Sequence, residues 1–201
     1  AGIRVSPSAI ELGLLLAIAY QETKEYAKAE AILQELARRA PRSAAVKLHL
    51  AVLLERKGDL AQAAACYEQA LAISPDDPVA GNNLAMLLLD NGGDPKRAFD
   101  LARRLCELYP GAAPMQDTLG WARFRRGEIA EAVEALRLAV RMNEKSATAH
   151  YHLGAALKAA GDEAGAIAAL KTARRLGSDK AAEMLKQLEA DGAKPEAAAP
   201  K

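Results

Sequence analysis

The side chains that could carry catalytic or metal chemistry are few, and their spacing suits neither. His150 and His152, in the stretch HYH, lie two residues apart, whereas a helical metal pair needs a spacing of about four. Cys66 and Cys106 form no C-x-x-C pair, and no base is identifiable beside either, so we expect buried free thiols. These patterns predict no enzyme activity, no metal and no cofactor.

The remaining motifs and the charge balance exclude further classes of function. The stretch NGGDPK lacks the Walker spacing and is interpreted as a turn, and no serine lies in a G-x-S-x-G elbow. The chain has 27 basic and 26 acidic residues, interspersed, which argues against a nucleic-acid partner. The longest apolar run, residues 12–20, is too short to cross a bilayer. We therefore expect neither nucleic-acid binding nor a membrane span.

One stretch, DTLGWARFRRG at residues 117–127, places Trp121 and Phe124 among three arginines. Aromatic side chains at an exposed surface are typical binding anchors, whereas buried ones only stabilise the fold. Which face of a helix each residue occupies depends on the register of the chain. The composition favours helices throughout, since alanine and leucine carry most of the apolar content and aromatic residues make up 4%.

The register comes from an internal repeat of 34 or 35 residues. Three columns share this period: a mid-repeat alanine, a leucine followed by a small residue, and a closing proline. The alanines are Ala29, Ala63, Ala98, Ala132 and Ala166; the leucines are Leu16, Leu50, Leu84, Leu119 and Leu153; the prolines are Pro41, Pro75 and Pro110. Small residues allow helices to approach closely and proline ends a helix, so each repeat is predicted to be a helix pair.

These columns resemble the tetratricopeptide repeat (TPR), a helix-turn-helix unit. The resemblance implies an all-α fold, a right-handed α-solenoid of five repeats closed by a capping helix. The expected segments are a lead-in at 1–9, repeats at 10–43, 44–77, 78–112, 113–146 and 147–178, a capping helix at 179–190 and a disordered tail at 191–201.

In this family the first helices of the repeats line a concave groove, so the resemblance implies which side chains face a partner. Trp121 takes a groove position, and Asn82 and Asn83 offer amides at the centre. The predicted partner-binding groove consists of His49, Val52, Asn82, Asn83, Met86, Asp117, Trp121, Phe124, Arg125, Tyr151 and His152. Two alternatives stay open: Trp121 packs against Phe124 or Tyr151, and Phe124 turns partly inward.

The first helix is apolar around most of its circumference, which predicts cover on more than one side. Leu14, Leu15 and Ile18 form a candidate self-association edge. The same face is equally consistent with burial by a preceding repeat, because we expect the chain to be part of a longer protein.

The sequence therefore predicts a non-catalytic scaffold that binds a protein or peptide partner in the groove. The basic carboxylate clamp of chaperone-tail-binding TPR proteins is absent, and Asn83 is the single rung of a possible asparagine ladder. Phrases such as NNLAMLLLDNGGDPKRAFDLARRL resemble repeats of bacterial TPR proteins of exopolysaccharide export and envelope assembly, which favours a periplasmic location over a cytoplasmic one. The alternatives are a self-assembling structural unit and the regulatory array of an enzyme.

Overall fold

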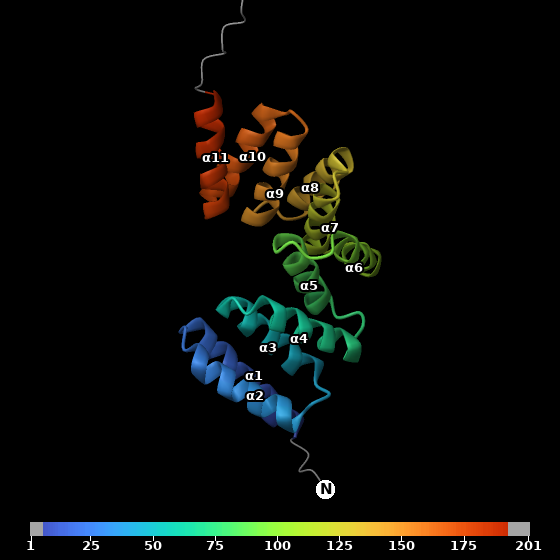
Figure 1. Cartoon of the computed structure of the whole chain (residues 1–201), viewed down its shortest axis with the longest axis vertical. Helices are drawn as coiled ribbons and strands as arrows, with labels where there is room; N and C mark the ends of the chain where they lie inside the picture. The colour runs from blue at the N-terminus through green and yellow to red at the C-terminus, as the bar shows by residue number, and fades with distance from the viewer. Residues whose placement is uncertain (1–5, 193–201) are drawn as a thin grey trace, which may run out of the picture. The chain divides into compact units, whose positions relative to one another are not determined.

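The computed structural model describes residues 6–192, which form α-helices joined by short turns (Figure 1). The helices are α1 (Pro7–Glu22), α2 (Tyr26–Arg39), α3 (Ala44–Lys57), α4 (Leu60–Ile73), α5 (Pro78–Asp90), α6 (Pro95–Leu108), α7 (Ala113–Arg125), α8 (Ile129–Met142), α9 (Ala147–Ala159), α10 (Glu163–Arg175) and α11 (Asp179–Gly192). Because residues 6–192 contain no strand, the predicted all-α class is confirmed.

Both ends of the predicted layout differ in detail from the helix bounds. Residues 1–5 of the expected lead-in lie outside the described range, and α1 already begins at Pro7. Residues 193–201 of the expected tail also lie outside it, while residues 191 and 192 belong to α11.

Short polar side chains set the starts of several first helices. Ser43 Oγ accepts a hydrogen bond from the Val46 N–H at 3.4 Å, and Ser146 Oγ accepts one from the Ala149 N–H at 3.1 Å. Asp77 precedes Pro78 and caps α5 in the same way. These bonds satisfy N–H groups that have no partner within the helix, so the local sequence determines where α3, α5 and α9 begin.

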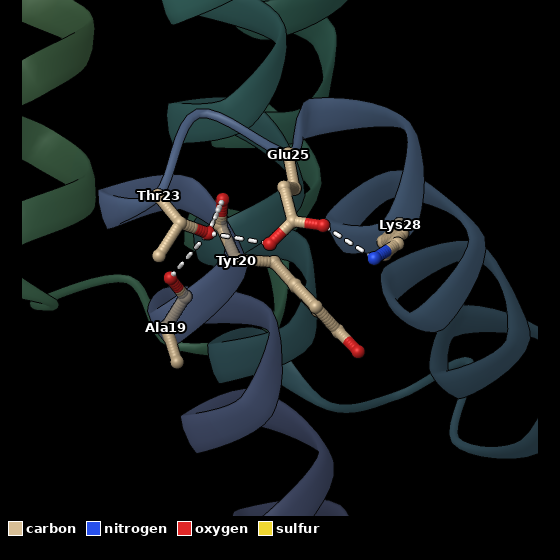
Figure 2. A network of polar contacts seen from close by, with 5 residues as sticks. All are labelled: Ala19, Tyr20, Thr23, Glu25 and Lys28. Atoms are coloured by element: carbon tan, nitrogen blue, oxygen red, sulfur yellow. Dashed lines mark hydrogen bonds and ion pairs between the residues drawn. The ribbon is translucent and has the colours of Figure 1, made fainter.

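The turn inside each helix pair uses a left-handed residue. Gly58 has a φ of +85°, and the equivalent position in the first repeat is Lys24, with a φ of +61°. Figure 2 shows the polar network at this glycine-free turn, where the Glu25 carboxylate lies between Thr23 and Lys28. Thr23 Oγ1 is 3.0 Å from Glu25 Oε1, and Lys28 pairs with the other carboxylate oxygen. Side-chain contacts thus hold a turn whose backbone disfavours lysine.

Glycines at the small-residue column allow the two helices of a repeat to pack closely. A Cβ atom on Gly120 would lie 2.6 Å from Leu136 Cγ, and one on Gly154 would lie 2.6 Å from Leu170 Cγ. Neither glycine therefore has room for a methyl group without movement of its neighbour. The predicted close approach is seen between α7 and α8 and between α9 and α10.

The chain divides into two compact units, residues 1–93 and 94–201. In the first unit, Leu14, Leu33 and Val46 belong to one apolar core built from α1, α2 and α3. In the second unit, Leu136 and Leu153 belong to a core that joins α8, α9 and α10. The closing helix α11 packs its Ala181, Leu185 and Leu188 against Leu170 and Ala173 of α10.

Candidate functional site

A polar network links three helices of the first unit at the predicted groove residue Asn83. The Tyr67 hydroxyl, from α4, donates to Glu55 Oε2 of α3 at 2.7 Å. Asn83 Nδ2, from α5, donates to the Tyr67 oxygen at 3.3 Å. The side chain of Tyr67 is fully buried, and burial together with the Glu55 carboxylate raises the pKa of its hydroxyl. Tyr67 therefore keeps its proton and connects α3 to α5, the first helices of successive repeats.

An open pocket of about 360 Å³ lies over this network. Its lining residues are Val52, Glu55, Arg56, Tyr67 and Asn83. Arg56 is paired with α1, since its Nη1 lies 3.3 Å from Glu22 Oε1. Val52 and Asn83, both predicted groove residues from different repeats, thus line the same pocket.

The other predicted groove residues of the first unit are half-buried on α3 and α5. His49 lies on α3, and burial lowers the pKa of its imidazole. Asn82 and Met86 lie on α5. None of the three lines the pocket described above, so their role as partner-binding residues stays a prediction.

In the second unit, Trp121 belongs to an aromatic cluster. Its ring stacks on Phe124 with centroids 4.8 Å apart and on His152 with centroids 4.2 Å apart. Tyr151 is tilted against Trp121 at 6.3 Å. The side chain of Trp121 is only 7% exposed. The alternative interpretation, in which Trp121 packs against its neighbours, describes this arrangement better than an open binding anchor does.

A buried hydrogen-bonded pair of polar side chains lies next to the aromatic rings. His152 Nδ1 is 2.9 Å from Asp117 Oδ1, and both residues are buried. Because a carboxylate can only accept, the imidazole carries its proton on Nδ1 in this bond. Two predicted groove residues thus bond to each other and connect α7 to α9. Phe124 and Tyr151 are half-buried, whereas Arg125 is exposed.

The structure therefore brings some of the predicted groove residues together in two sets, one in each unit. Val52 and Asn83 share the pocket of the first unit. Trp121, Tyr151 and His152 share the aromatic cluster of the second unit. A single groove that runs through both sets stays a prediction.

The predicted self-association edge is only partly at the surface. Leu14 is buried in the core of the first unit, Ile18 is half-buried, and Leu15 is 63% exposed. Two further leucines of α1, outside the predicted edge of Leu14, Leu15 and Ile18, are more informative. Leu12 is 70% exposed, although Val46 in the same column of the next repeat is fully buried.

Leu16 shows the same contrast along its column. It is 47% exposed, whereas its equivalents Leu84, Leu119 and Leu153 are buried. In the later repeats, these columns contribute to contacts with the preceding helix pair; Leu50, for example, packs on the core that contains Leu33 and Leu36 of α2. The exposed face of α1 is therefore a repeat-stacking face without a neighbour among the described residues.

Glu55 and Tyr67 were not among the site residues predicted from the sequence. Tyr67 was detectable in principle, because its column is otherwise apolar and contains Leu33, Ala102, Leu136 and Leu170. A lone hydroxyl in an apolar column needs a buried hydrogen-bond partner. That requirement points to a polar group on a neighbouring helix, although not to Glu55 in particular.

Other chemistry is sparse within residues 6–192. No group of three or more His, Cys, Asp or Glu side chains could hold a metal ion, and none of the helices there is long and apolar enough to cross a membrane. The thiols are half-buried rather than buried. Burial raises the pKa of Cys106 to about 11 and also raises that of Cys66.

The chain is similar to known repeat proteins over both units. A family model described as "Tetratricopeptide repeat" matches residues 14–78, and a second model, described as "TPR repeat", matches residues 120–161. These matches include the pocket residues Val52 to Tyr67 and the aromatic cluster from Trp121 to His152.

Two curated bacterial relatives are each 30% identical to the chain. One is a TPR repeat-containing protein of Pseudomonas aeruginosa, matched over 66% of this chain and 22% of its own length. The other is Protein FlbA of Caulobacter vibrioides, matched over 83% of this chain and 28% of its own length. The chain thus spans about a quarter of these relatives. A solved structure of pilF from Pseudomonas aeruginosa has a similar fold, with a TM-score of 0.72, 18% identity, and coverage of 92% of this chain and 88% of that one.

Proposed function

The chain belongs to the tetratricopeptide repeat family, and from that premise we propose that it is a non-catalytic scaffold whose first helices bind a peptide or partner segment. Proteins of this repeat type bind protein partners.

One observation supports the first-helix face of the first unit. Val52 and Asn83 come from first helices of successive repeats and line one open pocket, although neither belongs to the apolar core of α1, α2 and α3. The pocket combines an apolar wall with amide and carboxylate groups, which is the mixture that fixes a peptide's position. We place the contact there rather than at Trp121, whose ring is already covered by Phe124 and His152.

Affinity capture with matched variants tests this proposal. Val52→Asp puts a charge on the first-helix face, and Gln69→Asp puts the same charge on the exposed side of α4. After both variants are shown to be as helical and as stable as the wild type, each is used to capture partners from extract of the source cell. We expect Val52→Asp to lose a specific partner that Gln69→Asp retains. Loss of the partner with Gln69→Asp alone would indicate that the second helices, and not the first, bind it.

We also propose the bacterial envelope, in particular a polysaccharide-export assembly, as the setting of this interaction. The support is the resemblance of the repeat phrases around Asn82 and Trp121 to those of bacterial envelope TPR proteins. Fractionation of the source cell with protease protection tests the setting. Recovery of the chain only with cytoplasmic markers would contradict it.

A second candidate function, self-association through α1, rests on the exposed leucines. Leu12, Leu15 and Leu16 expose apolar surface on one helix, and such surface is commonly covered in an assembly. Light scattering at increasing protein concentration tests it, with a Leu12→Glu, Leu16→Glu variant as the control. A wild type that stays monomeric at high concentration would exclude this candidate.

A further inference from the structure

The network at Asn83 has a fixed direction. The Glu55 carboxylate has no proton to give, so the single proton of Tyr67 must lie in the 2.7 Å bond to Glu55 Oε2. The Tyr67 oxygen can then only accept from Asn83, which requires that Nδ2 and not Oδ1 of the amide faces it. Hydrogen-bond chemistry therefore sets the orientation of the Asn83 amide.

This orientation leaves two acceptors for a ligand. With Nδ2 used by Tyr67, the Oδ1 atom of Asn83 is available, and so is Oε1 of Glu55. Within residues 6–192 the structure gives neither oxygen a hydrogen-bond partner. Both residues line the open pocket, so a molecule in it meets one neutral and one charged acceptor.

The charge of the pocket also favours a ligand that donates hydrogen bonds, in particular a cation. Arg56, the basic residue of the described pocket lining, has Nη1 at 3.3 Å and Nη2 at 3.4 Å from Glu22 Oε1, so its charge is matched by a carboxylate of α1. Among residues 6–192, the Glu55 carboxylate is bonded only by the neutral Tyr67 hydroxyl. The local balance of these three charged groups is therefore negative, and it favours a cation.

We propose that this pocket, lined by Val52, Glu55 and Asn83, binds a lysine or arginine side chain of the partner segment. The cationic head donates to Glu55 Oε1 and Asn83 Oδ1, while Val52 contacts the aliphatic stem. Arginine fits best, because its planar fork bonds two acceptors at once. The inference rests on the proposed function, in that it names the side chain that the first-helix face selects.

The binding preference is tested by nuclear magnetic resonance with the whole chain and short synthetic peptides. The probes are alanine-based peptides that differ at one central residue: arginine, lysine, citrulline as the neutral counterpart of arginine, or glutamate. Titration to millimolar peptide follows the Asn83 side-chain amide and the Val52 methyl groups. We expect the arginine and lysine peptides to shift these signals, the citrulline peptide to bind about tenfold more weakly, and the glutamate peptide to have no effect.

A matched pair of protein variants separates charge from folding. Glu55→Gln keeps an oxygen that accepts from Tyr67 but removes the negative charge, and Glu11→Gln removes one carboxylate from exposed α1 surface outside the pocket. We expect Glu55→Gln to weaken the arginine peptide about tenfold and Glu11→Gln to leave it unchanged. Equal binding of the glutamate peptide, or arginine binding that Glu55→Gln does not weaken, would overturn the inference.

Failure of this inference is distinguishable from failure of the proposed function. One outcome is that Val52→Asp loses the captured partner but the arginine peptide does not shift the Asn83 amide signals. The first-helix face then binds a partner, but the pocket does not bind a cationic side chain of that partner. If capture depends on Gln69 alone, the proposed function itself is wrong.

Discussion

Asp117 Oδ1 accepts a hydrogen bond from His152 Nδ1 at 2.9 Å, and this bond joins two residues 35 positions apart in a buried site. The imidazole of His152 also stacks on the Trp121 ring with centroids 4.2 Å apart. One histidine therefore couples a polar bond to aromatic packing between successive repeats of the second unit.

Removal of the carboxylate should destabilise the second unit. Asp117→Ala leaves the buried Nδ1–H of His152 without an acceptor, which costs about 1–3 kcal/mol in the free energy of unfolding. Urea denaturation, followed by Trp121 fluorescence, measures the change. Asp117→Asn keeps an acceptor oxygen and should lose less. If Asp117→Ala is as stable as the wild type, the bond contributes nothing to the fold.

A methyl group at the helix crossing should also destabilise this unit. Gly120→Ala places a Cβ atom 2.6 Å from Leu136 Cγ, so the helices must move apart or Leu136 must change rotamer. After the gain in helix propensity is included, we expect a net loss of about 1–2 kcal/mol. Gly111→Ala is the control, because nothing lies within 4 Å of its Cβ position. Equal stability of the two variants in urea would show that the crossing is looser than described.

The turn at Lys24 offers a stabilising substitution. Lys24 has a φ of +61°, which glycine adopts without steric cost, so Lys24→Gly should raise the free energy of unfolding by about 0.5–1 kcal/mol. The reciprocal Gly58→Lys, at a φ of +85°, should lower it by a similar amount. Thermal unfolding of the two variants measures both effects. A destabilised Lys24→Gly would mean that the lysine side chain stabilises the turn more than its backbone strains it.

Acid should destabilise the first unit through His49. Burial lowers the pKa of His49 in the folded state, whereas in the unfolded state it returns to about 6.5. The unfolded chain therefore binds more protons, and the contribution of neutral His49 is fully present above about pH 6.5 and is lost as the pH falls through the folded pKa. The free energy of unfolding, measured by urea from about pH 7.5 to about pH 5.5, should fall less in His49→Gln than in the wild type. Parallel curves would assign the pH dependence to other groups.

The fold was predictable because its determinants are local and repeated. The 34-residue period, the capping residues Ser43 and Ser146, and the small residues Gly120 and Gly154 each act within one repeat. Helix order and class therefore follow from short stretches of sequence.

The candidate site was predictable only in part, because it depends on contacts between repeats. The family's position pattern places Trp121 on the groove face, but the ring is covered by His152 from the next repeat. Tyr67 likewise contacts Asn83 from the second helix of another repeat. The repeat position of each residue, taken alone, does not predict that their side chains lie within hydrogen-bond distance. Exposure of a groove position thus depends on which side chain the neighbouring repeat places over it.

Site-specific photo-crosslinking tests most directly whether the first helices of the first unit bind the partner. A photoreactive amino acid replaces Val52 in one variant and Gln69 in another, and the crosslinked peptides are identified by mass spectrometry after irradiation in source-cell extract. We expect crosslinks to one partner from position 52 and none from position 69. Crosslinks to that partner from position 69 alone would contradict it.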